Sequence, residues 1–221
     1  MSNEKIRKSC VDCVVHSCEV EDGIYPDFCP TAEMLDSTGC DCGLSEELFD
    51  EALNLYLDDE ENNNVAIAAA EVEYEHYCQM TRIEEIVEFA KKIRAKKVGI
   101  ATCIGLSKEA AVTAKILRKN GFEVYGVCCK IGAVPKIAIG LEITHETLGK
   151  NMCNPILQAK VLNEEKTDLN VVIGLCVGHD SLFYKYSDAL CTTLVTKDRV
   201  LGHNPVAALY QTESYYKKLL K

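Results

Sequence analysis

The sequence has 221 residues, of which 48% are hydrophobic and 26% charged, as expected for one ordinary globular domain with a small appendage. Its formal net charge of −10 argues against a general nucleic-acid binder, and no apolar run is long enough to span a membrane. The first residues contain no apolar export segment, so we expect a cytoplasmic protein. The 13 cysteines are unusual, and in such a compartment they favour thiolate ligands of a metal over disulfides.

Cysteines and charges are unevenly distributed along the chain. Six cysteines lie in residues 1–43, a segment with little periodicity and many turn-forming residues. Residues 1–96 contain 8 basic and 23 acidic side chains, whereas residues 97–221 contain 16 basic and 11 acidic ones. We therefore predict a cysteine-rich metal-binding segment over 1–43, a helical segment over 44–96 and an α/β domain over 97–221.

Three helical patterns follow the cysteine-rich segment. The spacing of apolar residues predicts helices over 45–57 and 65–79, and three consecutive asparagines at 62–64 predict a break between them. Thr81 and Glu84 form the pattern of a capping box, which predicts the start of a third helix.

From residue 97 onward, short apolar runs alternate with amphipathic helical patterns. The predicted strands are 97–103, 122–129, 169–176 and 190–196. The predicted helices are 107–120, 154–166, 180–187, with Asp180 as its cap, and 205–221, while 137–141 is ambiguous. Strands that are apolar on both faces indicate a parallel, Rossmann-like sheet with helices on both faces.

Thiols follow three of the predicted strands. Open parallel sheets bind ligands at the carboxyl ends of their strands, and the segments that reach this edge contain five cysteines: Cys103, Cys128, Cys129, Cys153 and Cys176. We expect them to hold a [4Fe–4S] cluster, with one ligand from the adjacent pair Cys128 and Cys129. Zinc could use the same thiolates.

Two glycines lie two residues after a cysteine at this edge. Gly105 and Gly178 are expected to allow tight turns that aim backbone N–H groups at the sulfur atoms.

A second metal site is predicted near the N-terminus. Cys10 and Cys13 form a Cys-x2-Cys knuckle, Cys18 follows, and Cys29 precedes a proline, as the last ligand does in ferredoxins. The spacing differs from that of ferredoxins, so a second [4Fe–4S] cluster and a structural zinc remain alternatives. Cys40 and Cys42 receive no role.

Polar residues follow the last predicted strand at the same edge. Lys197 and Arg199 are candidates for binding an anionic group, and His203 for proton transfer, since it precedes Asn-Pro as Cys153 does. These residues favour a cluster-dependent lyase or desulfidase acting on a small anionic substrate. The alternatives are a two-cluster protein that passes electrons to a protein partner and a zinc-binding regulatory protein. No nucleic acid or membrane partner is expected.

The chain resembles an uncharacterised family of archaea and anaerobic bacteria, domain of unknown function 1847, whose members are predicted to bind metal. The resemblance covers nearly the whole chain. It rests on the N-terminal cysteines, on Gly126-Val-Cys-Cys-Lys-Ile-Gly132, on Cys153-Asn-Pro155, on Gly174-Leu-Cys-Val-Gly-His-Asp180 and on Lys197-Asp-Arg-Val-Leu-Gly-His-Asn-Pro205. It implies cysteine-ligated metal without an agreed activity.

Overall fold

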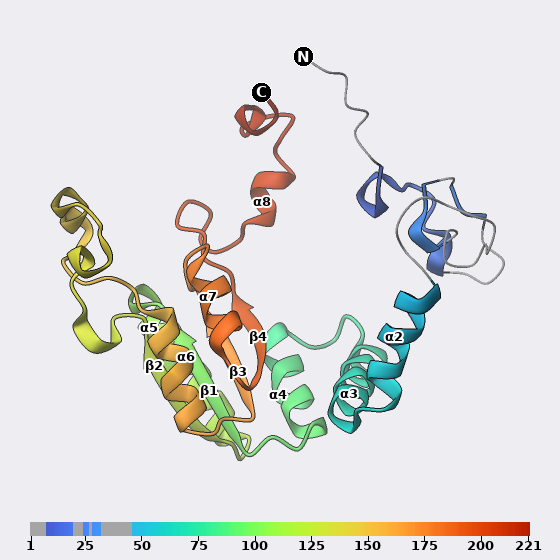
Figure 1. Ribbon diagram of the computed structural model, residues 1–221, viewed down its shortest axis with the longest axis horizontal. Coiled ribbons are helices and arrows are strands. Elements are labelled where there is room, and N and C mark those ends of the chain that lie inside the picture. Colours follow the sequence, from blue (N-terminus) through green and yellow to red (C-terminus); the bar gives the residue numbers. More distant parts are fainter. Residues whose placement is uncertain (1–7, 20–23, 27, 32–45) are drawn as a thin grey trace. The chain divides into compact units, whose positions relative to one another are not determined.

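The computed structural model describes residues 8–19, 24–26, 28–31 and 46–221 (Figure 1). Cys40 and Cys42 therefore lie outside the described residues. The chain divides into two compact units, Met1–Ile67 and Ala68–Lys221. Among the described residues, no helix combines the length and the apolar character that a membrane span requires.

The described part of the first unit consists of short turns followed by helix. Two 3-10 turns, Cys10–Asp12 and Ser17–Glu19, carry the first cysteines, and α2 spans Glu46–Leu57. Helix α3 spans Glu60–His76, so the predicted break at the three asparagines is wrong. The reason is a cap: the carboxylate of Asp59 accepts the N–H of Asn62 at 3.0 Å, which starts the helix before the asparagine run.

A four-stranded parallel sheet forms the centre of the second unit, as the sequence predicted. Its strands lie in the order β2-β1-β3-β4, and every neighbouring pair is parallel. The strands are β1 Lys97–Thr102, β2 Glu123–Cys128, β3 Leu169–Ile173 and β4 Leu190–Val195. Residues of β1 and β3 are buried on both faces, which is why their sequences are continuous apolar runs.

Helices pack on each face of this sheet. One core joins Val98 and Val171 to α4 (Arg82–Lys92) and α5 (Ser107–Lys119), and the other joins Ala101 and Val172 to α6 (Pro155–Glu164) and α7 (His179–Tyr186). Helix α4 begins with the predicted capping box, because the Glu84 carboxylate accepts the N–H and the hydroxyl of Thr81. Packing thus places α4 in the same unit as the sheet, although the change in charge lies at residue 96.

The predicted helix over 205–221 is mostly absent. Helix α8 spans only Val206–Leu209, and turns lead on to a 3-10 turn at Lys217–Leu220. Tyr210 and Tyr215 are 79% and 90% exposed. The apolar spacing therefore has no core to pack against, and helices of this length depend on such packing.

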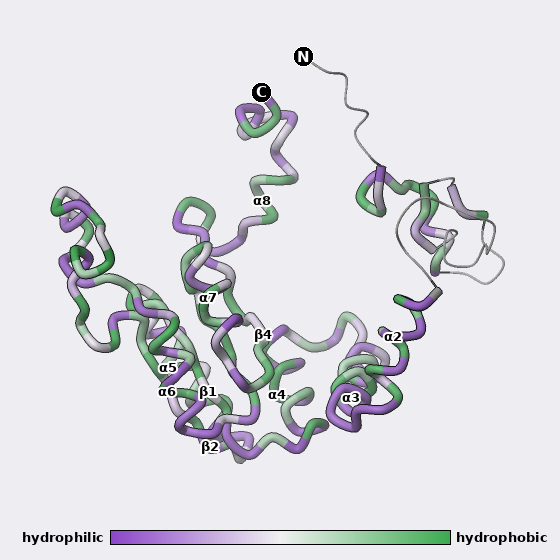
Figure 2. Tube along the Cα trace, viewed as in Figure 1, coloured by the Kyte–Doolittle hydropathy of each residue, from purple (hydrophilic) through white to green (hydrophobic). Residues whose placement is uncertain are grey.

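A loop segment leaves the sheet between β2 and α6. Residues 131–152, which we call the excursion, contain the 3-10 turns Ile131–Ala133, Lys136–Ile139 and Ile143–Leu148. The ambiguous stretch 137–141 begins inside the second of these turns and ends after it. It contains both apolar and polar positions (Figure 2). Its base is fastened by a hydrogen bond from Lys130 Nζ to the Asn151 carbonyl at 2.7 Å and one from Met152 N to the Val134 carbonyl at 2.8 Å.

Candidate metal centre

Backbone hydrogen bonds fix two of the thiols at the carboxyl edge of the sheet. The N–H of Cys103, directly after β1, donates to the Ile173 carbonyl of β3 at 3.1 Å. The N–H of Cys129, directly after β2, donates to the Thr102 carbonyl of β1 at 2.8 Å. Both side chains are almost fully buried, so the ends of the ladder set where these two thiols lie.

Cys153 joins this pair from a distant part of the sequence. The next residue, Asn154, donates its N–H to the Cys129 carbonyl at 2.8 Å, and its side chain caps α6 by accepting the N–H of Leu157 at 3.0 Å. This arrangement brings the thiols of Cys129 and Cys153 into hydrogen-bond contact. The N–H of Ile104 also donates to the Cys129 sulfur at 3.3 Å.

The contact between the two thiols separates their pKa values. The hydrogen bond from Cys129 lowers the pKa of Cys153 to about 5, and the nearby charges of Lys130 and His179 act in the same direction. The same hydrogen bond, together with burial, raises the pKa of Cys129. In the metal-free protein the two thiols therefore titrate as a coupled pair, and the contact favours the thiolate form of Cys153 over that of Cys129.

The neighbouring thiol, Cys128, is less buried than Cys129, but it packs against the same apolar core, which includes Cys103 and contacts Cys153. It is the last residue of β2. Cys129 interacts with both Cys153 and Cys103. Of the adjacent pair, Cys129 is thus the residue whose pKa the other thiols affect.

Cys176 reaches the same edge after β3 and pairs with Arg199. Its sulfur accepts a hydrogen bond from Arg199 Nη2 at 3.0 Å, and this contact raises the pKa of the guanidinium. The charges of Cys103 and Cys153 also raise the pKa of Arg199, to a smaller extent. Arg199 therefore links Cys176 electrostatically to the other thiols.

The turn after Cys176 starts α7, and its cap differs from the prediction. The N-cap is Gly178, in the left-handed conformation with φ of 82°, and the Cys176 carbonyl accepts the N–H groups of His179 and Asp180. The expectation that Asp180 caps the helix is wrong, because Asp180 lies within the first turn. Its carboxylate instead accepts the N–H of Ser181 at 2.9 Å.

Lys197 and the Cys103 thiol both lie close to Gly105. A Cβ added to Gly105 would be 3.9 Å from Cys103 Sγ and 4.0 Å from Lys197 Nζ, so thiol and ammonium flank the same point. Gly105 itself lies in a 3-10 turn, Ile104–Leu106, and has no positive φ. Gly105 therefore does not need the conformational freedom of glycine, whereas Gly178, with its positive φ, does need it.

His203 has a structural partner on its own loop. Its Nδ1 accepts the N–H of Asp198 at 3.1 Å, and the Asp198 carboxylate accepts the N–H groups of Val200 and Leu201. His203 thus closes the loop that carries Arg199. The histidine whose charge lowers the Cys153 pKa is His179.

A glutamine that the sequence did not single out lies beneath these thiols. Gln158 of α6 is completely buried, and its Nε2 donates to the carbonyls of Thr102 at 3.1 Å and Val127 at 2.7 Å. Its Oε1 has no hydrogen-bond partner within the part of the chain that the structure describes. In the sequence, the available signal for this residue was a polar side chain at an otherwise apolar position of the helical pattern of α6.

Local hydrogen bonds shape the turns that carry Cys10 and Cys13. The N–H of Cys13 donates to the Cys10 carbonyl at 3.2 Å, and the N–H of His16 donates to Cys13 Sγ at 3.5 Å. Cys10 and Cys18 are exposed, and Cys13 and Cys29 are partly buried.

Over residues 8–19, 24–26, 28–31 and 46–221, no three His, Cys, Asp or Glu side chains converge closely enough to hold one metal ion.

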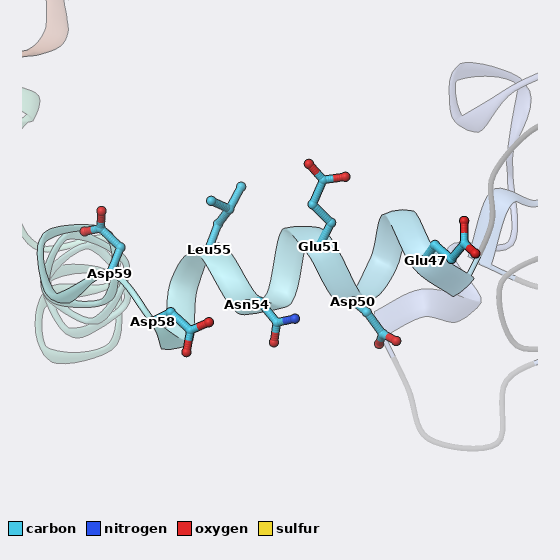
Figure 3. Close-up of a pocket in the computed structure, with 7 residues that line it drawn as sticks. All are labelled: Glu47, Asp50, Glu51, Asn54, Leu55, Asp58 and Asp59. Carbon is cyan, nitrogen blue, oxygen red and sulfur yellow. The ribbon is translucent and has the colours of Figure 1, made fainter.

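The pocket in Figure 3 has a different character. It lies along α2 in the first unit, and its lining contains no thiol. The lining is mainly acidic and consists of Glu47, Asp50, Glu51, Asn54, Leu55, Asp58 and Asp59. Their side chains leave the helix in several directions, so the pocket is an open surface rather than an enclosed site.

Comparison with known proteins adds three findings. A family model described as protein of unknown function, DUF1847, matches residues 40–194. An uncharacterized protein of Methanocaldococcus jannaschii is 48% identical over 186 residues, which are 83% of this chain and 93% of that protein. The crystal structure of Dph2 from Pyrococcus horikoshii with a 4Fe-4S cluster matches 63% of this chain and 33% of its own chain, with 21% identity and a TM-score of 0.33. This chain thus spans about a third of the Dph2 chain.

Proposed function

Because the chain belongs to the DUF1847 family, whose function is unknown, we propose a function from its own thiols: an iron–sulfur protein with a [4Fe–4S] cluster at the carboxyl edge of the sheet. Cys103, Cys129 and Cys153 hold the cluster, and Cys176 lies next to it with Arg199. One observation carries the proposal. Thiols from separate chain segments interact at one edge of the sheet, where cationic side chains accompany them.

The donor chemistry fits this group. Thiolates are the ligands of iron–sulfur clusters, and Lys130, Lys197 and Arg199 offset the negative charge that several thiolates and a cluster bring together. The N–H of Ile104 already points at the Cys129 sulfur, and hydrogen bonds to ligand sulfurs stabilise such clusters. The carboxyl edge is also where parallel sheets bind their ligands.

The surrounding residues favour a lyase that acts on a small anionic molecule. When bound, a cluster with one iron free of protein ligands supplies a Lewis acid for the leaving group. Arg199 and Lys197 bind the anionic group of the substrate and orient it. In its neutral form, His179 accepts the proton of a C–H bond, while a C–S or C–O bond on the neighbouring carbon breaks with both electrons leaving on sulfur or oxygen. A double bond forms, and no net oxidation occurs.

A second metal site in the first unit completes the proposal. Its ligands are Cys10, Cys13, Cys18 and Cys29, and its metal is either a second iron–sulfur cluster or zinc. The hydrogen bond from the His16 N–H to Cys13 Sγ supports a ligand role for that sulfur, because metal-bound thiolates commonly accept such bonds.

Anaerobic reconstitution with iron and sulfide tests the cluster. The expected product is brown and contains about four irons and four sulfides for the edge site. Cys129→Ser should lose this iron, and Cys128→Ser is the matched control that should retain it, because the two thiols are neighbours in sequence but the hydrogen bond to Cys153 comes from Cys129. A colourless protein that binds only zinc at the edge cysteines would refute the cluster.

A further inference from the structure

Gln158 connects the segments that carry three of the edge thiols. Its amide nitrogen donates to the Thr102 carbonyl, which immediately precedes Cys103, and to the Val127 carbonyl, two residues before Cys129. The Thr102 carbonyl also accepts the N–H of Cys129. Gln158 itself is on α6, whose N-cap Asn154 follows Cys153 and donates to the Cys129 carbonyl. One side chain therefore joins the ends of β1 and β2 to the start of α6.

The orientation of this amide follows from its partners. Both nearby acceptors are backbone carbonyls, so the NH2 group must face them, and the amide oxygen must point elsewhere. That oxygen is buried and has no donor among the described residues. Burying an oxygen without a donor opposes folding, so an unbranched apolar side chain of similar size would fill this space at lower cost.

We propose that Gln158 is a positioning residue of the metal centre, which sets the spacing of the Cys103, Cys129 and Cys153 segments before metal binds. The proposal rests on the function proposed above, since it concerns the same thiols. Preorganised ligands require supporting residues that are themselves held by hydrogen bonds. Gln158 meets this requirement from within the core rather than from the site's surface.

The decisive measurement is amide hydrogen exchange of the metal-free protein by NMR, which does not depend on any cluster. Gln158→Met removes the donor and keeps an unbranched side chain of similar length. The N–H groups of Cys129 and Asn154 should then exchange about tenfold faster, because local opening at the strand ends becomes easier. The Asp168 N–H, which donates to the Lys97 carbonyl at the opposite end of the sheet, should be unchanged. Gln158→Glu should act more strongly, because its carboxylate would face two carbonyl oxygens.

Asn163 supplies a matched control on the same helix. Its side chain donates to the Tyr186 carbonyl at 2.9 Å and accepts the N–H of Asp188 at 3.0 Å, away from the thiols. Asn163→Leu should lower the thermal midpoint without accelerating exchange at Cys129. In reconstituted protein, Gln158→Met should shift the reduction potential and the electron paramagnetic resonance spectrum of the cluster, and Asn163→Leu should not.

The outcomes separate the two proposals. Unchanged exchange at Cys129 in both Gln158 variants, or equal acceleration in Asn163→Leu, overturns the positioning role whatever metal is bound. Faster exchange in a protein that never takes up iron leaves the spacing role intact and overturns the iron–sulfur function. Faster exchange with an unmoved potential in the reconstituted protein shows that Gln158 acts on the fold alone, which also overturns its role at the metal centre.

Discussion

The two groups of cysteines differ in how their positions are fixed. The N-terminal thiols are close in sequence, and the hydrogen bonds at Cys10 and Cys13 span three residues, as in the bond from His16 to Cys13. The edge thiols are up to 73 residues apart in sequence, from Cys103 to Cys176, yet backbone bonds between strands and helix hold Cys103, Cys129 and Cys153. In this protein, the cysteines that are far apart in sequence are thus the ones whose backbone is held by contacts between strands and helix.

This difference separates two ways of building a metal site. In the first unit, Val11 and Val14 are 92% and 89% exposed, so the turns that carry the cysteines gain little from apolar burial. Such segments depend on their metal for stability. In the second unit, two apolar cores hold the sheet, and the thiols take their places as a result of folding.

The largest expected effect tests whether the two groups are separate sites. The double variant Cys129→Ser with Cys153→Ser should lose about four irons per chain after reconstitution, while the variant Cys10→Ser with Cys13→Ser should keep them. Iron and sulfide analysis measures both. If either double variant abolishes all metal binding while remaining folded, the two groups form a single site and the contrast is wrong.

Removing metal should affect the two groups unequally. Treatment with a strong chelator should expose residues 8–31 to proteolysis and leave the sheet and its packed helices, residues 97–130 and 153–195, resistant, because two apolar cores hold the latter. Mass spectrometry of the fragments locates the cuts, and protein with its metal restored is the control. Equal protection of both regions after chelation would contradict the metal dependence of the first unit.

The metal-free protein should show one unusually acidic thiol. Because the pKa of Cys153 is lowered to about 5, its thiolate forms as the pH rises through this value, and alkylation by iodoacetamide should already be near its plateau at neutral pH. Ordinary thiols, with pKa values of about 8.5, still accelerate between pH 7 and 9. Mass spectrometry of alkylated peptides gives the rate for each cysteine.

Two variants sharpen this measurement. Cys129→Ala should raise the apparent pKa of Cys153 the most, because the hydrogen bond from Cys129 is the largest cause of the shift, and Lys130→Met should raise it less. A Cys153 profile that matches that of exposed Cys78 would show that the contact with Cys129 does not form in solution.

The smallest effect concerns the packing beneath the edge. Gly174 follows β3 with φ of 60°, and a Cβ there would lie 2.0 Å from Leu106 Cδ1. Gly174→Ala should therefore lower the free energy of unfolding by about 2–4 kcal/mol, from backbone strain and a steric clash. Gly140, with φ of 82° and open space around it, is the matched control, for which about 1 kcal/mol is expected. If urea denaturation gives the same loss of unfolding free energy for Gly174→Ala and Gly140→Ala, the Leu106 side chain moves aside without an energetic cost.

Much of the fold could be predicted because its determinants are local. The apolar runs of β1 and β3 and the Thr81 capping box specify their elements within a few residues, and the parallel sheet follows from the alternation of strands and helices. The final helix over 205–221 could not be predicted correctly. Its apolar spacing is helical, but spacing does not reveal whether a core is available to bury Tyr210 or Tyr215.

The candidate site was predictable only in outline. The rule for parallel sheets predicts which edge receives the thiols, and their role in binding metal stays a prediction. The choice between Cys128 and Cys129 depends on the residue at which β2 ends, since consecutive side chains point to opposite faces. Gln158 was missed because its partners, two backbone carbonyls, carry no signature in the sequence, and its place in the apolar pattern of α6 was the signal that remained.

The excursion is suited to carrying an engineered insertion, because hydrogen bonds hold its two ends. Lys130 and Asn151 close its base, and Ile137, Ile139 and Leu148 are largely exposed along its length. An insertion near Gly140, where the surroundings are open, would lengthen the loop without displacing its ends, and long surface insertions cost little loop entropy. A fluorescent tag or an electrode tether placed there would report on the thiols from one loop away while leaving the sheet untouched.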